Sequence, residues 1–400
     1  MFEHFKQRFW LPPRAHGEAE IGRTVSFLEL FYDLVYVVVI ARAAHTLAEH
    51  LDWQGVLDFA AVFGLIWIAW INGTLYYDLH GRQDLRTRVF VFFQMLLLAL
   101  MAVFAAHVAD EDGAAFAIVF AIYMAVLGWL WYTVRRQDAD EYNTITFRYL
   151  VGMVLSVVII GSSAFLEPDV RMTVWLLYIL AWLVGSVVVA TTSLGPIEQS
   201  FSPSESMVER FGLFIIIVLG EVVVGAVDGM SDSERTALTI TTGMLGLMIG
   251  FAFWWTYFDF VGRRLPRVGR SFVQWMYSHL PITLSIAAAG AALVSLIEHA
   301  HDDRTPEATA WVLCGSIALG LCSIVITMKS LEDWDRFPTL YRPVAAATFA
   351  AAAIALVLGW LRPAPWLLAV LMLATLVAVW IFANYRWLQL DDPEAALPEA

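Results

Sequence analysis

Apolar runs long enough to cross a lipid bilayer fill almost the whole of this 400-residue sequence. A helix of about 20 residues spans a hydrocarbon core of roughly 30 Å, so each run predicts one membrane helix. Hydrophobic residues make up 60% of the chain and charged residues only 15%, whereas soluble domains carry about a quarter charged residues. The sequence therefore predicts an all-α integral membrane protein.

About twelve spans can be distinguished, although the fifth and sixth runs lie close together, as do the last two. The expected ranges are 25–47, 54–77, 88–108, 114–134, 148–166, 170–191, 207–228, 236–260, 271–297, 308–328, 343–361 and 364–385. Within them, small residues spaced four apart, such as Gly225 and Gly229, predict close approach to a neighbouring helix.

The loop charges predict the orientation. Nineteen of the 24 lysines and arginines fall on the side of the N-terminus, and the opposite side has only Arg171, Arg235, Arg304 and Arg362. Basic residues concentrate in cytoplasmic loops. Both termini are therefore expected in the cytoplasm of a bacterium, with the chain in the inner (plasma) membrane. The net charge is −13 and the sequence has no basic patch suited to nucleic acid, so nucleic acid is not an expected partner.

Three short motifs recur about 180 residues apart and predict an internal duplication. They are Ser26-x-x-Glu29-x-Phe31 with Ser206-x-x-Glu209-x-Phe211, Tyr77-Asp78-x-x-Gly81-Arg82 with Phe258-Asp259-x-x-Gly262-Arg263, and Arg88-x-Phe90-Val91 with Arg270-x-Phe272-Val273. Each half has an even number of spans, so the two repeats are expected to be parallel. Transporters often place their site at such a repeat interface. The expected organisation is a cytoplasmic segment (1–24), a six-helix repeat (25–191), a cytoplasmic linker (192–206), a second six-helix repeat (207–385) and an acidic cytoplasmic tail (386–400).

The run Val25-Ser-Phe-Leu-Glu29-Leu-Phe31-Tyr-Asp33-Leu-Val35-Tyr-Val37 resembles a signature of the bacterial low temperature requirement protein A family. So does the run Val208-Glu209-Arg210-Phe211-Gly212, continued to Gly220-Glu221, and Leu11-Pro12-Pro13-Arg14 also fits. The resemblance covers most of the chain and implies an integral membrane protein with a role in growth in the cold. The sequence departs from the family pattern at Tyr32 and Tyr36, where phenylalanine is expected.

Ionisable residues inside the spans are the candidate site, because each costs about 2.5–3.5 kcal/mol to insert and is retained for a reason. Asp33, Glu221 and Asp228, with Arg42, are expected to form a polar site between the two repeats. Shifted back by the repeat offset, Glu221 falls next to Arg42, which predicts an ion pair between the halves. The alternative is that Arg42 extends its guanidinium to the membrane surface.

Two further interpretations stay open for other polar residues within the spans. Glu29 and Glu209 follow a serine by three residues, the pattern of a capping box, and each could serve as a helix cap, an ion ligand or both. His279 lies near Pro281 and is either a proton relay or a hydrogen-bonded packing residue.

Two repeated motifs at the predicted cytoplasmic ends of spans 2 and 8 are candidate gates. They contribute Asp78 and Arg82 in the first repeat, and Asp259 and Arg263 in the second. The alternative is a structural role, in which the glycine of each motif caps the preceding helix.

The sequence favours a proton- or cation-coupled secondary transporter. The alternatives are a passive ion channel and a non-transporting scaffold or lipid-handling protein in cold adaptation. Motifs for nucleotide binding, serine hydrolysis, metalloprotease or thiol chemistry are absent, so no enzymatic activity, catalytic residue, cofactor or metal is expected. The expected partners are membrane lipids and an unknown small solute or ion, and homo-oligomerisation is left open.

Overall fold

The computed structural model describes residues 9–16, 18, 23–192 and 203–390. Within these ranges every regular element is a helix, and the one β-type pairing is an isolated antiparallel bridge between Pro266 and Leu331. Most of the predicted segment 1–24, of the linker 192–206 and of the tail 386–400 lies outside the described residues.

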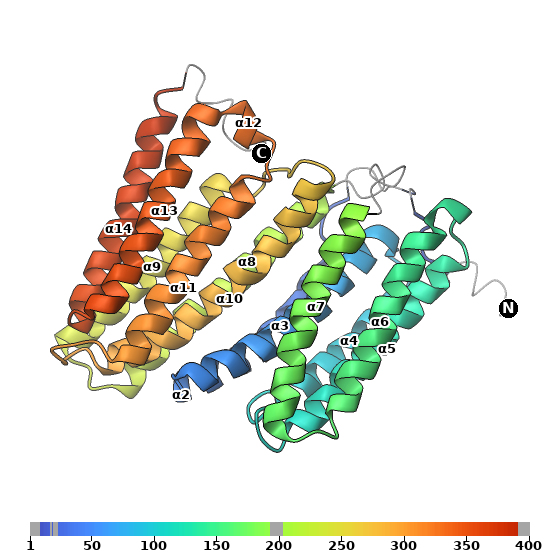
Figure 1. The fold of residues 1–400 in the computed structure, drawn as a ribbon, viewed down its shortest axis with the longest axis horizontal. Coiled ribbons are helices and arrows are strands. Elements are labelled where there is room, and N and C mark those ends of the chain that lie inside the picture. The colour runs from blue at the N-terminus through green and yellow to red at the C-terminus, as the bar shows by residue number, and fades with distance from the viewer. Residues whose placement is uncertain (1–8, 17, 19–22, 193–202, 391–400) are drawn as a thin grey trace. The chain divides into compact units, whose positions relative to one another are not determined.

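The described residues of the first half of the chain form six long helices and one short 3₁₀ turn, labelled as in Figure 1. Their bounds are α2 Phe27–Glu49, α3 Trp53–His80, α4 Leu85–Phe104, α5 Gly113–Arg135, η1 Asp140–Tyr142, α6 Asn143–Ser163 and α7 Pro168–Thr192.

In the second half, the part of the chain that the structure describes forms six more long helices and the short helix α12. Their bounds are α8 Glu205–Asp232, α9 Ala237–Phe260, α10 Arg270–Glu298, α11 Glu307–Met328, α12 Asp333–Arg336, α13 Pro338–Leu361 and α14 Pro365–Trp387.

Eleven helices in the described ranges are long and apolar enough to cross a membrane, and α2 is not among them. With 23 residues, α2 has a length of about 35 Å, which would suffice for a span, but it carries charged residues along its length. A multi-pass helical membrane protein is therefore confirmed, and the arrangement of twelve spans in two repeats stays a prediction.

The chain divides into two compact units. Unit 1 comprises residues 1–43 and 58–207, and unit 2 comprises residues 44–57 and 208–400. The residues that end α2 and begin α3 thus belong to unit 2. The domain boundaries expected from the repeat stay a prediction.

The core of unit 1 is built around α3. Every residue from 61 to 77 is buried, which is the pattern of a helix surrounded by others. Gly73 lets α2 and α5 come close, because a Cβ there would lie 2.7 Å from the Tyr32 hydroxyl and 3.0 Å from the Tyr123 hydroxyl. A side chain at position 73 would therefore force the Tyr32 hydroxyl to move.

The core of unit 2 is built around α10, which packs against α8 with the backbones in contact. A Cβ on Gly225 would lie 2.1 Å from the carbonyl oxygen of Gly290, and one on Gly290 would lie 2.6 Å from that of Glu221. The close helix approach predicted from the small residues of this span is confirmed at Gly225.

Candidate functional site

Asp33 is a fully buried acid in the middle of unit 1. Its side chain is 0% exposed and its Oδ1 accepts a hydrogen bond of 2.9 Å from the indole Nε1 of Trp70 in α3. A buried carboxylate needs such donors, because an unpaired charge inside a protein is strongly destabilising. The interior position expected for Asp33 is thus observed, and its role as an ion or substrate ligand stays a prediction.

Three tyrosine hydroxyls meet beside α3 in the same unit. The Tyr36 hydroxyl lies 3.2 Å from that of Tyr32 and 2.6 Å from that of Tyr123, and the Tyr32 and Tyr123 hydroxyls are also paired. All three side chains are fully buried. In the sequence, Tyr32 and Tyr36 stand out only as departures from the family pattern. Their spacing of four residues predicts a shared helix face, but nothing in the sequence points to Tyr123.

Glu29 forms the predicted capping box at the start of α2. Its Oε2 accepts from the backbone N of Ser26 at 2.9 Å, while its own backbone N donates to the Ser26 Oγ at 3.3 Å. The other carboxylate oxygen pairs with Arg23. The structural interpretation of Glu29 is therefore confirmed, and a further role as an ion ligand stays a prediction.

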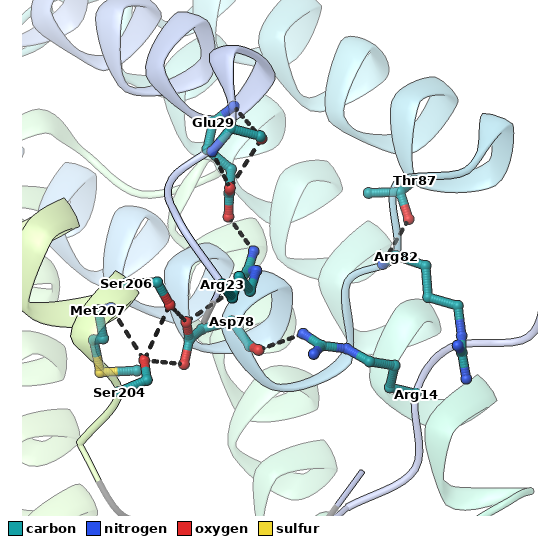
Figure 2. Close-up of polar contacts among 10 residues, drawn as sticks. Arg14, Arg23, Glu29, Asp78, Arg82, Thr87, Ser204, Ser206 and Met207 are labelled. Atoms are coloured by element: carbon teal, nitrogen blue, oxygen red, sulfur yellow. Dashed lines mark hydrogen bonds and ion pairs between the residues drawn. The ribbon is translucent and has the colours of Figure 1, made fainter. Parts of the chain in front are cut away.

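Asp78 is the centre of a polar cluster at the end of α3 (Figure 2). Its Oδ1 accepts from Arg23 Nη1 at 2.8 Å and from the Ser206 hydroxyl at 2.6 Å, and its Oδ2 accepts from the Ser204 hydroxyl at 2.9 Å. One side chain thus ties the segment before α2 to the end of α3 and the start of α8. We call these residues the Asp78 cluster.

The same cluster corrects the expectation for the second capping box. Ser204, not Ser206, caps α8, because its Oγ accepts from the backbone N of Met207 at 3.1 Å. Ser206 turns its hydroxyl to Asp78, and Glu209 is exposed. A capping box of Ser206 with Glu209 was therefore wrong, since a serine two residues earlier competes for the helix end. An ion-ligand role of Glu209 stays a prediction.

Arg82 holds the segment before α2 against the loop that follows α3. Its Nε donates to the carbonyl of Pro12 at 3.0 Å, and its Nη2 contacts both carboxylate oxygens of Glu18, at 2.8 and 2.9 Å. The Arg82 hydrogen bond lowers the pKa of the exposed Glu18 carboxyl below its ordinary value. Arg14 adds a bond from its Nη2 to the carbonyl of Asp78 at 2.6 Å.

A second anchor of this segment lies at the loop between α5 and α6. The backbone N and the Nδ1 of His16 contact the two carboxylate oxygens of Asp138 at 3.1 and 2.8 Å, and the imidazole stacks on Tyr142. Burial raises the pKa of Asp138, but the side-chain and backbone hydrogen bonds from His16 outweigh it and bring the pKa below its ordinary value.

The corresponding motif of unit 2 makes different contacts. Asp259 is half-buried and uses its backbone carbonyl, which accepts from Arg264 Nη2 at 2.9 Å, while Arg263 is exposed. Among the described residues, a positive backbone φ angle is found only at Gly269 (74°), Arg263 (61°) and Arg362 (52°). Gly81 and Gly262 are therefore not left-handed, but the backbone N of each donates to a tyrosine carbonyl in the last turn of the preceding helix, Gly81 to Tyr77 and Gly262 to Tyr257, both at 3.0 Å. The gating role of the two motifs stays a prediction.

The remaining candidate residues lie in α8, α10 and α2. Glu221 is buried and Asp228 is half-buried on α8, while Arg42 is exposed on α2 in the other unit, so an Arg42–Glu221 pair stays a prediction. His279 is buried in α10 with both ring nitrogens engaged, one with the Tyr257 hydroxyl at 2.8 Å and one with the Trp275 carbonyl at 2.6 Å. This is the hydrogen-bonded packing arrangement, and a proton-relay role stays a prediction.

Comparison with known proteins places this chain in a family. The sequence model described as bacterial low temperature requirement A protein (LtrA) matches residues 24–383. An uncharacterized protein of Rhizobium meliloti (strain 1021), RA0937, is 24% identical over 276 residues, which cover 64% of this chain and 66% of that protein. The match thus spans just under two thirds of the length of this relative. No solved structure matches the chain.

Proposed function

We propose that this chain, which belongs to the bacterial low temperature requirement A protein family, is a secondary transporter that couples a small solute to protons or cations. The observation that carries the proposal is Asp33, a carboxylate with no exposed surface on the 23-residue helix α2, which covers most of the predicted first span. An acid at such a depth costs about 2.5–3.5 kcal/mol to insert. That cost falls when the carboxylate is protonated or binds a cation, so an acid at this position favours uptake of the coupling ion.

The surroundings of Asp33 support a role in binding rather than in packing alone. The Trp70 indole orients the carboxylate with a 2.9 Å hydrogen bond, and on the same helix Tyr32 and Tyr36 meet Tyr123 in a buried group of hydroxyls that can donate or accept. Buried polar groups of this kind mark ion and proton pathways in membrane proteins.

A second buried acid occupies the helix that opens the second repeat. Glu221 is 6% exposed on α8, and Asp228, two helical turns further, is half-buried. α2 and α8 begin with the same sequence motif, so each predicted repeat contributes a buried acid. We assign Asp33 and Glu221 the coupling role, with Asp228 and Arg42 as supporting charges.

The test is solute-dependent proton movement in proteoliposomes. Vesicles carrying the full chain and the pH dye pyranine are given a pH gradient and exposed in turn to Na⁺, K⁺, divalent cations, amino acids and sugars. Wild type is expected to change the internal pH with one of these, and Asp33→Asn and Glu221→Gln to abolish the change.

Asp169→Asn is the matched control, because Asp169 is an exposed acid in the first turn of α7. It is expected to behave as wild type. If Asp33→Asn and Glu221→Gln respond as wild type does, the assignment of these acids is wrong. Ion currents in planar bilayers that need no proton gradient would instead indicate a channel.

A further inference from the structure

A cavity of about 410 Å³ lies in unit 1 where α2 begins, α3 ends and α4 begins. It opens at the end of the helices where the segment before α2 and the Asp78 cluster lie, which is the predicted cytoplasmic end. Its walls come from residues 23–29, from Tyr77 and 81–83, and from the first turns of α4. The candidate transport residues other than Glu29 and Arg82 do not line it.

The lining of the cavity carries an excess of positive charge. Arg23, Arg82 and Arg88 line it, and Glu29 is the only acid among the lining residues. Arg23 is paired with Glu29 and Asp78, and Arg82 with Glu18. Arg88 is exposed, and no ion pair or side-chain hydrogen bond holds its guanidinium among the residues that the structure describes. The cavity is thus prepared for an anion, with Arg88 available to bind it.

The cavity is also bounded by apolar surface. Val25, Phe27, Leu28 and Val91 line it beside the arginines, and Phe27 is 90% exposed. From Phe27 an apolar stripe continues along α2 at helical spacing, through Phe31, Leu34 and Val38, each more than half exposed. A soluble anion would leave this stripe unused, whereas acyl chains would cover it.

We propose that this cavity binds the phosphate of an anionic phospholipid, with the acyl chains lying along the exposed stripe of α2. Arginine suits this role because its planar guanidinium donates two parallel hydrogen bonds to phosphate oxygens. The hydroxyl of Thr87 stands in the same lining and can donate to a remaining oxygen. Basic pockets between membrane helices on the cytoplasmic side are suited to anionic headgroups. The proposal is independent of the transport role of Asp33.

Native mass spectrometry of the full chain in detergent tests the proposal. Phosphatidylglycerol is added in one arm and phosphatidylcholine in another, and the fraction of lipid-bound protein is followed against lipid concentration. Wild type is expected to prefer phosphatidylglycerol. Arg88→Gln is expected to weaken its binding about five-fold, the effect of one arginine charge near an anionic lipid.

Two further variants test whether lipid binding needs the open cavity, and whether removing any exposed arginine weakens it. Gln83→Trp fills the cavity from an exposed lining position and leaves all three arginines in place, so it is expected to reduce binding as well. Arg136→Gln removes an exposed arginine at the end of α5, outside the cavity, and is expected to bind as wild type does. The melting temperature of each variant checks that it is folded.

A final arm distinguishes a lipid from a soluble phosphate. Inorganic phosphate and glycerol 3-phosphate are added as competitors and are expected not to displace phosphatidylglycerol, since they lack the acyl chains. Displacement by either, equal binding of both lipids, or unchanged binding by Arg88→Gln and Gln83→Trp would overturn the proposal. None of these results bears on the pyranine experiment, because Asp33 and Glu221 do not line the cavity.

Discussion

The two Asp-x-x-Gly-Arg motifs have the same sequence pattern and make different contacts. In unit 1 the Asp78 carboxylate accepts from one arginine and two serines, and Arg82 holds the segment before α2. In unit 2 the Asp259 carboxylate accepts no hydrogen bond within the described residues, and Arg263 is exposed. A recurring sequence motif thus keeps its place at a helix end while its contacts depend on the segments that pack there.

In unit 2 the residues after the motif, not the motif itself, hold the loop in place. The buried Arg264 pairs with Asp333, and Arg267 pairs with Asp335. The backbone N of Arg267 also donates to Ser330 at 2.8 Å. The loop after α9 is thus fastened to the segment between α11 and α13, whereas the loop after α3 is fastened to the segment before α2.

The largest difference in stability between the two motifs is expected when each aspartate is replaced in turn. Asp78→Ala leaves Arg23 without one of its two carboxylates and breaks two serine hydrogen bonds, so it is expected to cost about 2–4 kcal/mol of unfolding free energy. Asp259→Ala is expected to cost under about 1 kcal/mol. Unfolding titrations in mixed detergent measure both. Equal losses would break the comparison.

A smaller effect is expected from the two glutamates of the repeated Ser-x-x-Glu pattern. Glu29→Ala removes a capping box and an ion pair and is expected to cost about 1–2 kcal/mol. Glu209→Ala is expected to cost at most about 0.5 kcal/mol, because Glu209 is exposed and does not cap α8. The same unfolding titrations measure both losses. A loss for Glu209→Ala as large as that for Glu29→Ala would restore the second capping box.

The smallest effect is expected for the pH dependence of the contact between His16 and Asp138. This contact fastens the same segment before α2 that Arg82 holds, so it bears on the comparison of the two units. The pKa of Asp138 is lower folded than unfolded, so the unfolded chain binds protons first as the pH falls. Its stabilisation is fully present above the ordinary aspartate pKa of about 3.9 and is lost below it. The difference in melting temperature between wild type and Asp138→Asn is therefore expected to shrink below about pH 4. A constant difference would contradict this anchor.

The sequence predicts most of the helices and part of the site. Hydropathy locates the long helices, because twenty apolar residues have few other structures open to them. The burial of Asp33 and the capping box of Glu29 could be predicted because their evidence is local: an acid within an apolar run, and a serine three residues before a glutamate. The bond between Ser206 and Asp78, and the meeting of Tyr123 with Tyr36, join residues 128 and 87 positions apart. Such contacts depend on helix rotation and register, which hydropathy does not determine.

The contact of α8 with α10 has a mechanical consequence. With Gly225 and Gly290 backbone to backbone, neither helix can slide or turn past the other without a steric collision, since there is no side chain between them to yield. The carbonyl of Glu221 lies at that contact, so the height of this acid is locked to α10. If α10 is displaced, α8 and the Glu221 carboxylate are therefore expected to move with it as one rigid body.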